Sequence, residues 1–138
     1  MQSINDIKED LELLIDDIDS RYEYILDLGK DLDISNDIIS SENEVQGCLS
    51  KVWVKVNIIN DKVYLDVNSD ALTVKGILYI IKSYYDGVAL NEAKNMNFSE
   101  KASEIKLESY LSTNRRNGLN SISEFIKNKI INNQGNQQ

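Results

Sequence analysis

The sequence contains no histidine and a single cysteine, Cys48, in 138 residues. A cysteine protease needs a base beside its thiol, so the absence of histidine excludes papain-like and caspase-like enzymes. A dithiol oxidoreductase needs a second cysteine, and a structural zinc site needs four cysteine or histidine ligands, so both are excluded. Two interpretations are left: a lone thiolate that reacts with another molecule, or a buried free cysteine that packs as a small apolar side chain, which is the usual state of such residues.

The charge and hydropathy of the chain exclude further classes. Its net charge of −8 argues against binding to the nucleic-acid backbone or to anionic membrane surfaces. No apolar run is long enough to cross a bilayer, and the first residues lack the basic and apolar regions of a secretory signal. We therefore expect a cytoplasmic protein, with proteins or small molecules as its partners and no bound metal.

The amino-terminal part of the sequence predicts a helical hairpin. Apolar residues recur at steps of three and four over residues 3–18, and the serine that opens this run is available as N-cap. A second helix is expected to begin at Asp19 or Ser20 and to end at Gly29, which is followed by a lysine. Residues 31–42 are polar and predict only a connection.

The middle of the sequence predicts a small antiparallel sheet with one buried face. Strand patterns cover residues 43–46 and, after a break at the cysteine, residues 50–59; a turn at 60–61 leads into a return strand at 62–68. Alternation places four apolar side chains on one face: Val52, Val54, Val56 and Ile58. Trp53 falls on the opposite face, where it either anchors a partner or packs beneath a helix.

Several helices follow the sheet. We expect a third helix to open at Ser69 and Asp70, with the Asp70 carboxylate as its N-cap, and to end at Gly87. Its apolar residues cover much of its circumference, so it should lie on the sheet as the central helix. Short helical pieces are predicted at residues 90–94 and 99–105.

The last helix is expected to open near Ser112 or Thr113 and to lead into a tail rich in asparagine and glutamine. The predicted organisation is one domain over residues 1–131 and a disordered polar tail over residues 132–138. Two helices, a compact β-meander and further helices indicate the α+β class.

Three separated strings also carry a resemblance to a known family. They are Gly47-Cys48-Leu49-Ser50 followed by Val52-Trp53, Ser69-Asp70-Ala71 with Val74-Lys75-Gly76, and Leu111-Ser112-Thr113-Asn114-Arg115 with Asn117-Gly118-Leu119. In this order and spacing they resemble the SufE family of sulfur acceptors. Tyr22-Glu23-Tyr24 and Asp27-Leu28-Gly29 resemble the helix that precedes these motifs, so the resemblance covers residues 20–130.

The resemblance implies a SufE/IscU-like α+β fold and a role in iron–sulfur cluster assembly. It implies that Cys48 accepts persulfide sulfur from a pyridoxal-phosphate-dependent cysteine desulfurase of the SufS or CsdA type. The protein would stimulate that desulfurase and deliver the sulfur to a SufBCD-like scaffold complex. On this interpretation it is a transfer component and not an independent enzyme. It needs no cofactor of its own, and it is a monomer or weak homodimer.

The resemblance also assigns roles to individual residues. Arg115 matches the family arginine and would stabilise a thiolate or persulfide anion, and Asp70 would support the cysteine turn as a helix cap. We expect partner contacts from four residues around the thiol: Gly47, Leu49, Ser50 and Trp53. Two positions depart from the family pattern, which usually has glutamine at Leu49 and Ser-Pro-Ser at residues 112–114.

Alternative functions stay open at this point. The motifs fit the SufE and CsdE subfamilies equally. A different class of function is an acidic adaptor that binds a partner through Trp53 while Cys48 is a buried structural residue. An iron–sulfur scaffold of the IscU type requires several cluster ligands, which one cysteine and no histidine do not supply.

Overall fold

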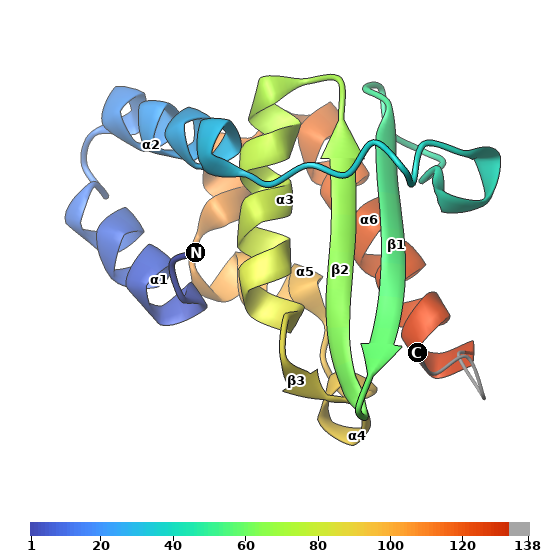
Figure 1. Ribbon diagram of the computed structural model, residues 1–138. Coiled ribbons are helices and arrows are strands. Elements are labelled where there is room, and N and C mark those ends of the chain that lie inside the picture. Colours follow the sequence, from blue (N-terminus) through green and yellow to red (C-terminus); the bar gives the residue numbers. More distant parts are fainter. Residues whose placement is uncertain (133–138) are drawn as a thin grey trace.

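The computed structural model describes residues 1–132 (Figure 1). Its elements are, in order, α1 (Ile4–Leu13), α2 (Ile18–Asp31), η1 (Ser41–Asn43), β1 (Val52–Ile59), β2 (Lys62–Ser69), α3 (Leu72–Tyr85), β3 (Val88–Ala89), α4 (Leu90–Ala93), α5 (Phe98–Glu104), η2 (Leu107–Tyr110) and α6 (Thr113–Asn132). The strands form one antiparallel sheet in the order β1-β2-β3, so the predicted α+β class is confirmed. The predicted tail lies, except for Asn132, outside the described residues.

β1 and β2 form the predicted hairpin, and its alternating apolar residues enter the core. Val52, Val54 and Ile58 are fully buried. The turn residues Asn60 and Asp61 have φ values of +52° and +63°. A two-residue hairpin turn of type I′ requires this left-handed conformation at both positions, and asparagine and aspartate adopt it more readily than most residues. The turn therefore forms without glycine.

On the side of β2 that faces away from β1, backbone groups that β3 does not reach bond to side chains and to the connection between α2 and η1. β3 pairs only with the first residues of β2. Beyond it, the Leu65 N–H donates to Asp86 Oδ1 at 2.8 Å and the Leu65 C=O accepts from Lys82 Nζ, while the Lys82 and Asp86 side chains form an ion pair at 2.7 Å. Further along, the Ser35 N–H donates to the Val67 C=O at 3.2 Å. The polar connection thus protects a strand edge that would otherwise be open.

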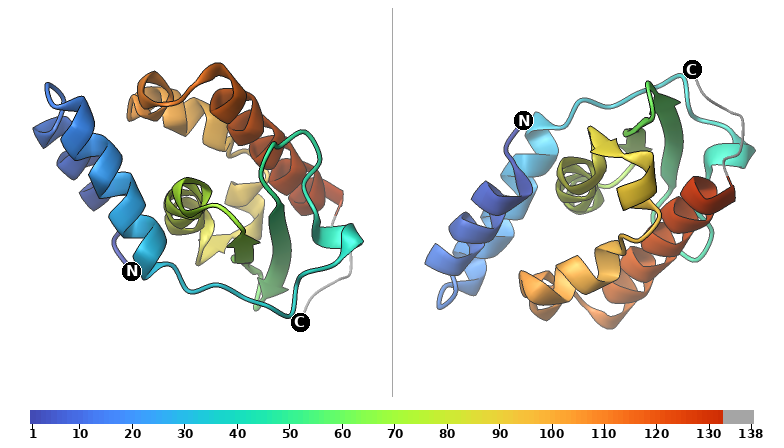
Figure 2. Two further views of the ribbon diagram at one scale, coloured as in Figure 1. Left: turned by 90° about the horizontal axis from the view of Figure 1, so that it is seen from above. Right: turned by 90° about the horizontal axis from the view of Figure 1, so that it is seen from below.

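Two helices cover the apolar face of the sheet, and a third packs against one of them. α3 contacts β2 and α6 contacts β1, while α2 crosses the far side of α3 (Figures 1 and 2). A Cβ atom on Gly76 would lie 2.1 Å from the Ile25 carbonyl oxygen, and one on Gly29 would lie 2.6 Å from that of Leu72. The two glycines allow the α2 and α3 backbones to touch. Gly29 is therefore a packing residue inside α2, and the predicted helix end there was wrong.

The boundary between the first two helices also differs from the prediction. α1 ends at Leu13, and Ile18 begins α2 and is 68% exposed, so the first helix does not continue to Ile18. The N-cap of α2 is Asp17, whose Oδ1 accepts the N–H of Ser20 at 3.0 Å. The predicted cap at Asp19 or Ser20 was wrong. The helical hairpin itself is confirmed (Figure 1).

Two further predictions about local structure were wrong. Residues 43–46 do not form a strand, because only Glu44 makes a bridge, to Trp53. Asp70 is not the cap of α3, because the N-cap is Ala71, which makes no side-chain capping bond. The short helices predicted after α3 correspond to α4 and α5. Within residues 1–132, no helix is long and apolar enough to span a bilayer.

Candidate functional site

The candidate site is built where residues Gln46–Ser50, here called the cysteine segment, lie along α6. Gly47 has a φ of +88°, and a Cβ atom on it would lie 2.6 Å from the Ser121 Oγ. In the next residue, the Cys48 Sγ donates to the Gly118 carbonyl oxygen at 3.7 Å. Residues 118 and 121 are one helical turn apart, so successive residues of the segment follow one face of α6.

The third contact between the segment and α6 brings a cation to the site. The Arg115 Nη1 donates to the Ser50 Oγ at 3.2 Å. Arg115 lies one turn before the Gly118 carbonyl that accepts from the thiol, in the first turn of α6. The Ser112 Oγ accepts the N–H of Arg115 at 3.3 Å, which is the contact expected of an N-cap and agrees with the predicted start of this helix.

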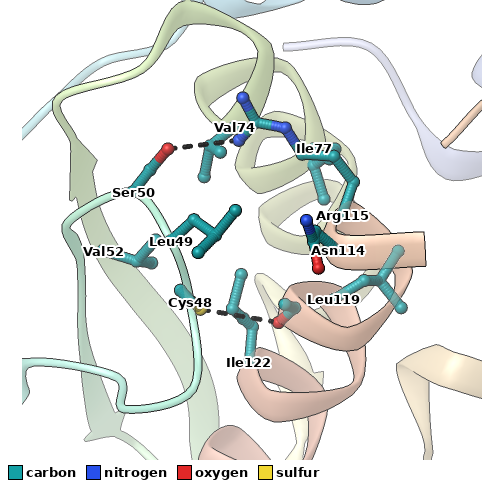
Figure 3. A pocket seen from close by; sticks show the side chains of 11 residues that line it. Cys48, Leu49, Ser50, Val52, Val74, Ile77, Asn114, Arg115, Leu119 and Ile122 are labelled. Atoms are coloured by element: carbon teal, nitrogen blue, oxygen red, sulfur yellow. Dashed lines mark hydrogen bonds between the residues drawn. The ribbon is translucent and has the colours of Figure 1, made fainter. Parts of the chain in front are cut away.

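A pocket opens between the cysteine segment, α3 and α6 (Figure 3). Its apolar lining comes from three elements: Val52 of β1, Val74 and Ile77 of α3, and Leu119 and Ile122 of α6. Its polar lining is Ser50, Asn114 and Arg115, and Cys48, Leu49 and Gly118 complete it. The cavity volume is about 30 Å³, which is enough for roughly one water-sized atom.

Opposing effects act on the Cys48 thiol. The side chain is half-buried, and this burial raises its pKa, whereas the positive charge of Arg115 acts to lower it. The effect of burial is the larger one. The hydrogen bond to the Gly118 carbonyl also requires the proton on sulfur. The site therefore holds a neutral thiol at rest and offers the anion one favourable charge, that of Arg115.

Both ends of the cysteine segment are fixed to the sheet. At one end, the Val45 N–H donates to the Val52 C=O at 2.9 Å. At the other, the Lys51 N–H donates to Asp70 Oδ1 at 3.0 Å, and the Lys51 C=O accepts from the Ser69 hydroxyl at 2.7 Å. Between these anchors the segment is held by its α6 contacts. Its contacts with α6 are therefore separate from its attachment to the sheet.

The structure brings together most of the residues that the sequence singled out. Cys48, Leu49, Ser50 and Arg115 line one pocket, and Gly47 adjoins it. Leu49 lines the pocket but is 83% exposed, so its side chain lies at the surface. Asp70 does not line the pocket, but it holds the residue that follows the segment.

Trp53 does not belong to this pocket. It is half-buried on the opposite face of β1 and pairs with Glu44. Asn114 and Gly118 were missed as pocket residues, although both lie in the string that contains Arg115. The part of the chain that the structure describes contains no group of three or more metal-ligating side chains able to hold an ion.

Comparison with known proteins identifies the family. A family model described as "SufE: Fe-S metabolism associated domain" matches residues 5–130. The chain belongs to the SufE family. This SufE-family chain is 32% identical, over 94% of its length and 95% of the relative's, to an uncharacterised SufE-like protein of Rhizobium meliloti (strain 1021). It is 32% identical, over 79% and 77% of the two lengths, to the cysteine desulfuration protein SufE of Wigglesworthia glossinidia brevipalpis.

Solved structures support the same fold. The SufE-family chain superposes with a TM-score of 0.73 on the solution structure of a hypothetical protein from Thermus thermophilus, at 18% identity, covering 90% of this chain and 92% of the other. At this identity the likeness concerns the fold alone.

Proposed function

We propose that this SufE-family protein is a sulfur carrier that accepts persulfide sulfur on Cys48 from a pyridoxal-phosphate-dependent cysteine desulfurase. It stimulates that desulfurase, of the SufS or CsdA type, and delivers the sulfur to a SufBCD-like scaffold in the cytoplasm. The observation that carries the proposal is the placement of the only thiol against a small apolar pocket beside an arginine.

The chemistry is a thiol exchange that this site can perform without a base of its own. The Cys48 thiolate attacks the terminal sulfur of the donor's persulfide, a new S–S bond forms at Cys48, and the donor's S–S bond breaks. The donor cysteine leaves as a thiolate and takes up the proton that Cys48 gave up, so no net oxidation or reduction occurs. The pyridoxal phosphate stays on the desulfurase.

The pocket is suited to the product of this exchange. Its volume of about 30 Å³ accommodates one added sulfur atom beside Cys48. Its apolar lining keeps small thiols away from the persulfide, and Arg115 supplies a positive charge for the persulfide anion. A carrier gains from this shelter because free thiols in a reducing cytoplasm strip exposed persulfides.

The exchange itself requires the thiol to leave this position. Attack on a persulfide needs an open, nearly linear approach, whereas the Cys48 Sγ faces the Gly118 carbonyl on α6. We propose that the cysteine segment swings outward on the desulfurase while the flanking residues Val45 and Lys51 stay fixed. The exposed Leu49 side chain, next to the thiol, is the natural first contact for the partner.

Whether stimulation of a desulfurase depends on Cys48 distinguishes a sulfur carrier from an adaptor. Alanine production by a desulfurase is measured with the wild-type chain and with Cys48→Ser, and binding of both chains is measured separately. A carrier predicts that Cys48→Ser binds with similar affinity but does not stimulate turnover. If Cys48→Ser stimulates as well as the wild type, the adaptor function is correct and the thiol is structural.

A further inference from the structure

We propose that Ser50 is a positioning residue, whose hydroxyl holds the Arg115 guanidinium at the pocket that Cys48 lines. This inference rests on the proposed function, since a positioned cation matters to a site where a sulfur anion forms. The sequence suggested only a partner contact for Ser50.

The geometry shows why Arg115 needs such a contact. Arg115 lies in the first turn of α6, where the positive end of the helix dipole disfavours a cation. Within residues 1–132, none of the ion pairs includes Arg115. The bond from its Nη1 to the Ser50 Oγ is what directs this long side chain across the pocket toward the cysteine segment (Figure 3).

A serine is well suited to this task. Its hydroxyl is a neutral acceptor, so it directs the guanidinium without cancelling its charge. A guanidinium has five N–H donors, and the Ser50 bond uses one of them. The remaining donors are left for a thiolate or persulfide. A carboxylate at this position would hold Arg115 more tightly but would neutralise it.

The contact also joins the cation to the nucleophile. Cys48 and Ser50 belong to one segment, whereas Arg115 belongs to α6. Arg115 is therefore positioned by Ser50 while the segment rests on the helix, which is the state that shelters the persulfide. While the segment lies on α6, Arg115 is positioned and the sulfur on Cys48 is sheltered. When the segment leaves α6, both conditions end.

The ionisation of Cys48 reports the position of Arg115 directly. Among the pocket residues contributed by the segment, β1, α3 and α6, only Cys48 and Arg115 are ionisable. Lys51, the next charged residue along the chain, pairs with Glu44 at 3.2 Å. Burial also shifts the pKa of Cys48. A change in the pH at which Cys48 ionises can thus be assigned to Arg115 when the fold is intact and access to the thiol is unchanged.

The test is the pH dependence of alkylation of Cys48 by iodoacetamide in the full chain, which has no other thiol. The midpoint of the profile reports ionisation, and its high-pH plateau reports access. We expect Arg115→Gln to raise the midpoint by about one pH unit. Ser50→Ala should raise it by about half a unit, a roughly threefold loss of thiolate at neutral pH. Ser50→Thr should restore the wild-type midpoint.

A double variant decides whether Ser50 acts through Arg115. In the Arg115→Gln chain, adding Ser50→Ala should leave the midpoint unchanged. Ser121→Ala is the matched control, since this serine also meets the segment from α6 but bonds no guanidinium in the described chain, and it should leave the midpoint unchanged. The proposal is overturned if Ser50→Ala alone has no effect, or if its effect is the same with and without Arg115.

The experiment uses no desulfurase, so its outcome is independent of sulfur transfer. If the alkylation midpoints of the variants shift as expected but the chain never accepts sulfur, the proposed function is contradicted and the role of Ser50 stands. If the chain accepts sulfur but the midpoints do not shift as expected, only the role of Ser50 is overturned.

Discussion

Replacing Gly47 with alanine should release the cysteine segment from α6 while leaving the fold intact. At a φ of +88°, an alanine carries the strain of the left-handed region, which costs about 1–2 kcal/mol. Its Cβ atom would also lie 2.6 Å from the Ser121 Oγ, so that side chain must rotate. The segment is held to α6 by the Cys48–Gly118 and Ser50–Arg115 bonds, worth roughly 1–2 kcal/mol together. The free-energy cost of the strained alanine is therefore similar to the free energy with which the two bonds hold the segment on α6.

The consequence is a larger population of the open segment. A change of about one to two kcal/mol alters such a population by a factor of about 5–30. We expect the rate at which a bulky maleimide labels Cys48 at neutral pH to rise by a factor in this range. The melting temperature should change little, because the anchors at Val45 and Lys51 remain. Adding Ser121→Ala to the Gly47→Ala chain removes the Oγ atom that the new Cβ meets, so it should reverse part of the increase in the labelling rate.

Gly87→Ala is the matched control for this variant. Gly87 has a φ of +82°, but nothing lies within 4 Å of the position of its Cβ, and it lies at the end of α3 and not at the pocket. It should lower the free energy of unfolding by about 1–2 kcal/mol without changing the labelling of Cys48. If Gly47→Ala instead behaves like Gly87→Ala, with lower stability and unchanged labelling, the cysteine segment is a rigid part of the fold and our account of its mobility is refuted.

Three other predictions concern stability. Gly76→Ala places a Cβ atom 2.1 Å from the Ile25 carbonyl oxygen. The free energy of unfolding, measured in urea, should therefore fall by about 3 kcal/mol. A loss below about 1 kcal/mol would show instead that α2 moves away easily. Burial raises the pKa of Cys48 above its ordinary value of 9.0, so the stability that the neutral thiol contributes is present below that pH and is lost as pH rises through the folded pKa. Cys48→Ala should therefore weaken the decline of stability above that pH, and an identical decline in both chains would contradict this. Asp70→Ala removes the acceptor of the Lys51 N–H and should cost about 0.5–1 kcal/mol and speed maleimide labelling, whereas Asp70→Asn, which keeps an acceptor, should do neither.

Local patterns predicted the central part of the fold well. The alternation of β1 and the continuous apolar surface of α3 are each properties of one segment, so they can be found in the sequence. The structure confirms both, with Val52, Val54 and Ile58 buried on one face and α3 packed on β2. The start of α6 was predicted for the same reason, because its Ser112 cap is a local contact.

Two of the wrong predictions depend on contacts between distant segments. Gly29 looked like a helix end, but it is needed where α2 touches α3 at Leu72. Asp70 looked like a cap, but its carboxylate accepts from Lys51, which is far from it in sequence. In both cases a tertiary contact uses a residue that local rules assign to a boundary.

The candidate site was predictable only in part. The family motifs drew attention to Cys48 and Arg115, but they did not show that Ser50 joins the two elements that carry them. The alignment of the cysteine segment along α6 is a property of the folded chain. No spacing within either segment indicates it.

The central claim, that Cys48 carries sulfur, is tested most directly by intact mass. The full chain is incubated with a cysteine desulfurase and free cysteine, and its mass is measured before and after treatment with a reductant. We predict a gain equal to one sulfur atom, confined to chains that retain Cys48 and removed by the reductant. A wild-type chain that binds the active desulfurase but shows no such gain would contradict the account.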